Sequence, residues 1–239
     1  MLGIPSDIGE SCHTMKLETQ RRLAAEASRG ISSGPSYDLA RKFLSACGNP
    51  GRILEFGAGT GNFARRLITE RVVSEITCAD ILPEPETLPT GIEWIHADLN
   101  NPLSVPDEAF DTLVCIEVIE HLENPRAVFR EFHRVLRSGG AVILTTPNQE
   151  SLRSLAGLVL GRHFAAFLGA SYPAHITALL EIDLRRICAE TGFETPNIDY
   201  THTGRIPKLT RLRWPQVFRG RWFSDNLGLI TQKKLNENF

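Results

Sequence analysis

The amino-acid sequence predicts an α/β fold in which helices cover both faces of a doubly wound sheet. Two observations carry this prediction. Short apolar runs alternate with segments of helical spacing from residue 52 onward, which is the pattern of strand–helix–strand units. In addition, the glycine-rich stretch EFGAGTG at 55–61 follows the first apolar run, as expected for the turn that joins a first strand to its helix.

The expected elements follow one another in a regular order. Two N-terminal helices, at 17–27 and 37–47, precede the sheet and cover it. Strands are predicted at 52–56, 75–81, 92–99, 110–118 and 141–147, and helices at 62–70 and 124–140, the second ended by Gly139 and Gly140. After an irregular insert at 151–176, we expect a helix at 181–190 ended by Gly192, an extended segment at 193–200 and a last strand at 226–234.

Composition excludes several classes of protein. The 26 Lys and Arg against 28 Asp and Glu give a formal net charge of −2, which provides no global field toward nucleic acid or anionic lipid. The five cysteines, at 12, 47, 78, 115 and 188, contain no C-x-x-C pair, so we expect reduced, mostly buried thiols rather than disulfides or a zinc site. No run of 18 apolar residues and no signal peptide are present; we therefore expect a cytoplasmic protein.

Three glycines occupy the first strand-to-helix turn. In an open α/β sheet this turn brings backbone N–H groups close to a ligand, and Gly57, Gly59 and Gly61 allow close approach and unusual backbone angles. The third glycine comes one residue earlier than in the dinucleotide fingerprint G-x-G-x-x-G, and the P-loop lysine is missing. An NAD-dependent oxidoreductase is therefore the less favoured alternative.

Two aspartates follow the next strands. Asp80 ends the strand in TCAD, about twenty residues after the glycines, where a carboxylate accepts both hydroxyls of a ribose. Asp98, in HADL, follows the third strand and is placed to face an adenine amino group. Each of them alone is also explained as a cap of the following segment.

Together, these segments resemble class I S-adenosylmethionine-dependent methyltransferases, closely over 50–150 and loosely to the end. The matching segments are EFGAGTG, Asp80, HADL and FDTLVCIEVIEHLENP at 110–125. Within this family, the segments resemble most the enzymes that methylate small molecules, such as the ubiquinone-biosynthesis O-methyltransferases. The resemblance implies a Rossmann-like seven-stranded methyltransferase sheet and S-adenosyl-L-methionine as the cofactor.

The resemblance also implies roles for single residues. Glu55 would face the amino acid end of the cofactor through the loop, and the three glycines would line its methionine and ribose portions. Asp80 would bind the ribose hydroxyls, Asp98 and Leu99 would border the adenine, and Ile116 would lie beneath it. We interpret 1–239 as one domain: a helical cover at 1–50, the cofactor-binding core at 50–150, and a substrate-covering insert with the last strands at 151–239.

A sulfonium methyl group is already electrophilic, so catalysis requires mainly alignment, exclusion of water and, for a hydroxyl acceptor, removal of a proton. His121 in EVIEHL is the first candidate for the base because a near-neutral pKa suits the task; a structural role in the loop is the alternative. His175, in the insert, is the second candidate, with helix capping as its alternative. Glu117 and Glu120 complete the titratable groups near the site, and no residue identifies a metal requirement.

Missing motifs narrow the acceptor. The Asn/Asp-Pro-Pro-Tyr/Phe tetrad of enzymes that methylate amino groups of DNA adenine or protein glutamine is absent after the fourth strand, and so is the Pro-Cys pair of cytosine-C5 enzymes. These absences argue against DNA as a substrate. We predict transfer to an oxygen of a small molecule, such as a sugar, a secondary metabolite or a lipid-linked precursor, with nitrogen or carbon, or a catalytically silent partner subunit, as the alternatives.

The segment 204–223 matches none of the cofactor-binding or catalytic motifs described above. Residues 204–223 carry six Lys or Arg and no acid, interleaved with four aromatic residues. Such a segment binds an anionic membrane surface or a lipid-linked substrate, binds phosphates, or packs on the domain or on a second copy in a homodimer. Pro215 and Gly220 interrupt any long amphipathic helix, which weakens the reading as a membrane anchor.

Overall fold

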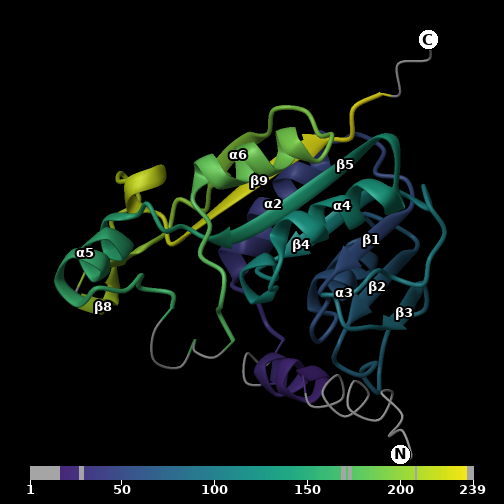
Figure 1. Cartoon of the computed structure of the whole chain (residues 1–239), viewed down its shortest axis with the longest axis horizontal. Helices are drawn as coiled ribbons and strands as arrows, with labels where there is room; N and C mark the ends of the chain where they lie inside the picture. The colour runs from purple at the N-terminus through teal and green to yellow at the C-terminus, as the bar shows by residue number, and fades with distance from the viewer. Residues whose placement is uncertain (1–16, 27–29, 168–170, 172–173, 208, 236–239) are drawn as a thin grey trace, which may run out of the picture.

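A seven-stranded sheet forms the centre of the molecule (Figure 1). The computed structural model describes residues 17–26, 30–167, 171, 174–207 and 209–235. In spatial order the strands are β3 (Ile92–His96), β2 (Ile76–Asp80), β1 (Ile53–Phe56), β4 (Phe110–Ile116), β5 (Leu136–Pro147), β9 (Asn226–Gln232) and β6 (Asn197–Tyr200). The strands from β3 to β5 are parallel, and β9 runs antiparallel between β5 and β6. The predicted doubly wound α/β fold is confirmed.

Helices cover both faces of this sheet. The pair α2 (Gly34–Ala46) and α3 (Asn62–Thr69) packs on one face, and the pair α4 (Pro125–Val135) and α6 (Glu181–Glu190) on the other. Each helix buries apolar residues spaced three or four apart, as the amphipathic pattern requires: Leu39 and Phe43, Phe63 and Leu67, Phe129 and Phe132, and Leu184 and Ile187. The two cores therefore lie on opposite sides of β1 and β4.

Local sequence sets where these helices begin. The side chain of Ser33 accepts a hydrogen bond from the backbone N–H of Ser36 at the start of α2, and Asn124 does the same for Ala127 at the start of α4. Pro125 occupies the first turn of α4, where its missing N–H has no cost. Predicted helices and strands up to residue 124 are confirmed, including the helical residues 17–26, although residue 27 lies outside the described residues.

The prediction of a helix at 124–140 is wrong at its C-terminal end. Helix α4 stops at Val135, and Leu136 already has extended backbone angles (φ −85°, ψ 137°). Leu136 pairs with Phe110, after which the register shifts. Gly139, with φ of 72°, lies within β5, so the glycines accommodate an irregularity in this strand rather than ending the helix.

The predicted irregular insert contains a helix, α5 (Leu152–Gly161), whose start is capped by Ser151. A two-stranded sheet, β7 (Arg205–Ile206) with β8 (Leu209–Arg213), and a short 3₁₀ helix, η3 (Arg221–Phe223), lie beside α5. Figure 1 shows this group at the end of the molecule away from β1, β2 and β3. None of the described helices combines the length and the apolar content needed to cross a bilayer.

Candidate active site

A cavity of about 960 Å³ opens where β1, β2 and β4 end. The carboxyl ends of parallel strands are where open α/β sheets bind ligands. All but one of the predicted site residues line the cavity: Glu55, Gly57, Gly59, Asp80, Asp98, Leu99, Ile116, His121 and His175. The exception is Gly61. Sequence reasoning therefore located the walls of one continuous cavity, drawn from segments more than a hundred residues apart.

Glycine is required at two positions of the loop after β1. Gly57 has φ of 86°, and a Cβ atom there would lie 2.2 Å from Cγ2 of Val118. Gly59 has φ of 57°, and its Cβ would lie 2.2 Å from the carbonyl oxygen of Gly30. Because left-handed angles and close contacts coincide, any side chain would displace the loop. Gly61 is also left-handed, at φ of 71°, and its contribution is to begin α3 rather than to line the cavity.

Asp80 is fixed by backbone donors. One carboxylate oxygen accepts the N–H of Gly59 at 2.6 Å, and the other accepts the N–H of Leu82 at 2.7 Å. The residue is 6% exposed, and burial raises the pKa of its carboxyl. Each oxygen retains a further lone pair, so the side chain is held in one orientation with acceptor capacity left for a ligand.

Glu55, on β1, holds the start of α3, which follows the glycine loop. Its Oε2 atom accepts the N–H of Ala64 in the first turn of α3 at 3.1 Å and lies 3.6 Å from Sγ of Cys78. Burial raises the pKa of this carboxyl to about 8. The side chain thus couples β1 to the N-terminus of α3 while facing the cavity.

Asp98 is held by a residue that sequence reasoning missed. Arg21, from the helical segment 17–26, places Nη1 2.5 Å from Oδ2 of Asp98 and Nε 3.0 Å from Oε1 of Glu123. Leu99 and Ile116 are both buried and provide apolar wall. Nothing in the local pattern around Arg21 signals a partner 77 residues away. The contact places the N-terminal helix over the cavity.

The chain leaves β4 through a strained residue. Glu117 has φ of 53°, a left-handed value that is uncommon outside glycine. Its carboxylate accepts the N–H of Ser33 at 2.8 Å and the side-chain amide of Asn226 at 2.7 Å. This turn leads directly into η1 (Ile119–His121), so it aims the following side chains into the cavity.

Glu120 is fully buried. Its Oε2 atom accepts the hydroxyl of Thr146 at 3.1 Å, while Oε1 has no hydrogen-bond partner. Burial, with a smaller contribution from Glu117, raises the pKa of this carboxyl to about 8. A buried acceptor without a donor costs roughly 1–3 kcal/mol, which sets Glu120 apart from Glu117.

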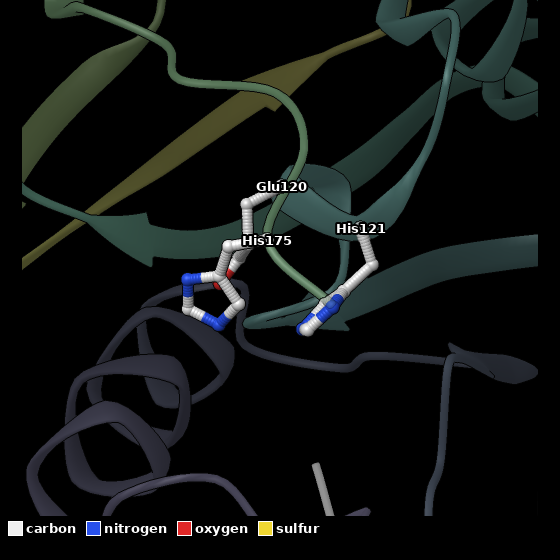
Figure 2. A group of neighbouring side chains, drawn as sticks. All are labelled: Glu120, His121 and His175. Atoms are coloured by element: carbon white, nitrogen blue, oxygen red, sulfur yellow. The ribbon is translucent and has the colours of Figure 1, made fainter. Parts of the chain in front are cut away.

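The two predicted histidines meet beside Glu120 (Figure 2). The rings of His121 and His175 stack edge to face with centroids 4.7 Å apart. Nδ1 of His121 lies 2.9 Å from the carbonyl oxygen of Ala174; because a carbonyl only accepts, Nδ1 carries the proton and Nε2 keeps its lone pair in the neutral ring. Burial lowers the pKa of His121 to about 4 and lowers that of His175.

Backbone bonds hold these histidines together. The carbonyl oxygen of Glu120 accepts the N–H groups of Ile176 and Thr177, each at 2.9 Å. The hydroxyl of Thr177 donates to the carbonyl oxygen of Leu122 at 2.7 Å. The insert is therefore bound to the η1 segment by backbone and hydroxyl bonds directly after His175, and by the ring of His121 on Ala174 directly before it. His175 packs on Phe167 and caps none of the described helices.

Comparison with known protein sequences identifies the family of the chain. The chain matches the methyltransferase-domain family over residues 26–196. It is 27% identical over 189 residues to the malonyl-[acyl-carrier protein] O-methyltransferase of Paenibacillus sp. (strain JDR-2), covering 74% of this chain and 65% of that protein. It is 27% identical over 133 residues to the ubiquinone biosynthesis O-methyltransferase of Xanthomonas euvesicatoria pv. vesicatoria (strain 85-10), covering 52% of this chain and 51% of that protein. The chain thus spans about half to two thirds of these relatives.

Solved structures agree on the fold. The 1,6-didemethyltoxoflavin-N1-methyltransferase of Burkholderia thailandensis, solved with its substrate and S-adenosylhomocysteine, superposes with a TM-score of 0.60 over 98% of this chain and 92% of that one, at 14% identity. At this identity the likeness concerns the fold alone. The match over residues 26–196 shows that the chain belongs to the methyltransferase-domain family, and the strand order and the structural neighbours show the fold of the S-adenosylmethionine-dependent methyltransferases.

Proposed function

We propose that the chain transfers the methyl group of S-adenosylmethionine to a hydroxyl oxygen of a small molecule. The observation that carries this proposal is the meeting of Glu120, His121 and His175 in the same cavity as the glycine loop and Asp80. The two relatives named above as O-methyltransferases support oxygen as the acceptor. The Burkholderia neighbour, an N1-methyltransferase, keeps nitrogen as the alternative.

The cavity divides into two ends under this proposal. At the donor end, formed by the glycine loop, Asp80 and Asp98, Asp80 binds the ribose hydroxyls. Asp98 and Leu99 border the adenine and Ile116 lies beneath it, while Glu55 faces the amino acid portion. The burial of Leu99 and Ile116 and the fixed carboxylate of Asp80 support these roles.

The acceptor end is formed by Glu120, His121 and His175. Methyl transfer requires the acceptor oxygen in line with the sulfur–carbon bond, and loss of the hydroxyl proton before or during attack. In the absence of a metal ion, Nε2 of His121 is the proposed base because its ring is neutral and its tautomer is fixed by Ala174. Its pKa of about 4, lowered by burial, is below the near-neutral value expected from the sequence, so it is a weaker base than expected. His175 is the second candidate; both rings are partly buried in the cavity wall.

The basic stretch 204–223 bears on the kind of acceptor that the chain binds. Val217, Phe218 and Trp222 are exposed at 84%, 41% and 49%, within the basic stretch 204–223, and Phe218 also packs on Trp214 with ring centroids 5.6 Å apart. This surface supports a lipid-linked acceptor or a peripheral membrane contact, and a homodimer face is its alternative use. Lys208 lies outside the described residues.

Two further proposals concern the whole protein. We keep the single-domain division at residues 50 and 150, because the cavity is closed by all three parts. We also keep the cytoplasm as the compartment, supported by the four free thiols among the described residues: Cys47, Cys78, Cys115 and Cys188. Cys12 lies outside these residues.

A transfer assay with radiolabelled S-adenosylmethionine tests the proposal. The purified chain is offered hydroxylated sugars, quinone precursors and other phenols, with amine analogues of the same compounds in parallel. We expect label in an ether product and equimolar S-adenosylhomocysteine. Label in the amines alone would make nitrogen the acceptor, and binding of the cofactor without transfer to any acceptor, including cell extract, would favour the silent partner subunit.

A further inference from the structure

We propose that Glu120, His121 and His175 bind a divalent transition-metal ion that holds the acceptor oxygen. Each of the three side chains offers one ligand atom, and these atoms all lie within 4.8 Å of one another (Figure 2). Two imidazole nitrogens with one carboxylate oxygen form a donor set typical of Zn²⁺, Fe²⁺ and related ions. This inference rests on the proposed function and specifies how the acceptor end works.

Unused polar atoms point to this site. Oε1 of Glu120 and Nδ1 of His175 are both buried without a hydrogen-bond partner. No Lys or Arg among the described residues forms an ion pair with Glu120, whose side chain is 0% exposed. A buried atom of this kind in a cavity wall is costly unless a ligand satisfies it. A bound cation would satisfy Oε1 of Glu120.

The surroundings of the cluster also fit a metal site. A ligating histidine usually donates its second ring N–H to a carbonyl, and a ligating carboxylate is usually hydrogen-bonded through its other oxygen. Nδ1 of His121 faces the carbonyl oxygen of Ala174 at 2.9 Å, which leaves Nε2 for the metal. The hydroxyl of Thr146 donates to Oε2 of Glu120, which leaves Oε1. The side chains of His121 and Glu120 are therefore each held in place by a hydrogen bond that leaves one ligand atom free.

Glu117 does not belong to the group of side chains whose ligand atoms lie within 4.8 Å of one another. Both of its oxygens already accept hydrogen bonds, from Ser33 and from Asn226. Its part is to turn the chain out of β4 so that Glu120 and His121 face the cavity. A tetrahedral site with bonds of about 2.1 Å places ligand atoms about 3.4 Å apart, so ligand atoms that now lie within 4.8 Å of one another would move closer together when an ion binds.

The proposed ion has a defined chemical task. An ion held by Glu120, His121 and His175 would bind the acceptor hydroxyl in the cavity and make it more acidic, and the hydroxyl proton would pass to solvent at the cavity opening. A lone pair of that oxygen then forms the bond to the methyl carbon. The carbon–sulfur bond breaks with its electron pair returning to sulfur, which yields the ether and S-adenosylhomocysteine. Under metal-bound conditions the histidines act as ligands rather than as bases.

Titration of the metal-free protein with Zn²⁺ by calorimetry, and with Co²⁺ followed by visible absorption, tests this inference. We expect one ion per chain, with affinity reduced by roughly 100-fold or more in Glu120→Gln and in His175→Ala. The matched controls are Glu190→Gln and His133→Ala, which change the same residue types outside the cavity. S-adenosylhomocysteine binding, measured in every variant, reports that the fold and the donor end are intact.

The outcomes separate the two proposals. Absence of stoichiometric binding by a chain that still binds S-adenosylhomocysteine overturns the metal site and leaves the proposed function standing. Metal binding that persists unchanged in both Glu120→Gln and His175→Ala also overturns it. Stoichiometric binding that both variants lose and both controls keep supports it, whether or not the acceptor is known.

Discussion

The donor end and the acceptor end of the cavity are built in different ways. The donor end is organised by backbone: the loop of Gly57 and Gly59, with its left-handed angles, donates to the carboxylate of Asp80. The acceptor end is formed by side chains from two distant segments: His121 and His175 are 54 positions apart in the sequence and meet where the ring of His121 contacts the carbonyl oxygen of Ala174. The backbone geometry of the loop is determined by one contiguous motif. The meeting of side chains from distant segments depends on the whole fold. The class of cofactor can therefore be predicted from the sequence, whereas the identity of the acceptor cannot.

The largest effect is expected at the donor end. Asp80→Ala removes the acceptor of the Gly59 and Leu82 N–H groups and the proposed ribose ligand. We expect binding of S-adenosylhomocysteine to become undetectable by calorimetry. Asp80→Asn, which retains one carbonyl oxygen, is expected to weaken binding without abolishing it. Wild-type affinity in Asp80→Ala would remove Asp80 from the cofactor site.

A change at the acceptor end should spare cofactor binding. His121→Ala deletes the ring that approaches Ala174 and His175. We expect kcat to fall by roughly 100-fold or more, with the affinity for S-adenosylhomocysteine within about twofold of wild type. The measurement is steady-state transfer to the best acceptor of the assay panel. Unchanged turnover would exclude His121 both as a base and as a ligand.

Stability should depend on pH through Glu55. Its carboxyl has a pKa of about 8 in the folded chain against 4.5 as the ordinary value, so the folded state binds a proton more tightly than the unfolded state. The free energy of unfolding therefore falls as pH rises from about 4.5 to about 8.

Glu55→Gln keeps an acceptor for Ala64 and removes this titration. We expect the variant to exceed wild type in stability at pH 8, by on the order of 1–3 kcal/mol, and to differ little from it at pH 5. Chemical denaturation at the two pH values measures the difference. A stability difference that is the same at both would show that Glu55 is charged in the folded protein throughout.

The smallest effect is expected where the two ends are joined. Arg21 bridges Asp98 of the donor end to Glu123, which follows η1. The Arg21 and Asp98 side chains are 19% and 9% exposed and Glu123 is 48% exposed. The Arg21–Asp98 pair should therefore contribute more than the roughly 1 kcal/mol of an exposed pair, and we expect Arg21→Ala to weaken cofactor binding by about tenfold. The loss should shrink as salt is raised in calorimetric titrations. An effect that is independent of salt would point to packing of the helical segment instead.

The sequence predicted local features of the donor end better than contacts between distant segments. The alternation of strands and helices, Asp80 at the end of its strand and the glycine loop were predicted because period, turn chemistry and spacing are local properties. The end of α4 at Val135 was not, since Leu136 is drawn into β5 by pairing with Phe110. Arg21 and the unpartnered oxygen of Glu120 were missed because their meaning arises only from distant neighbours.

Parallel calorimetric titrations with S-adenosylmethionine, S-adenosylhomocysteine and NAD test the central claim most directly. The geometry of Gly57, Gly59 and Asp80 predicts that one molecule of either sulfur compound binds per chain and that NAD does not. Binding of NAD alone, or silence of the folded chain toward both sulfur compounds, would contradict this account of the cavity.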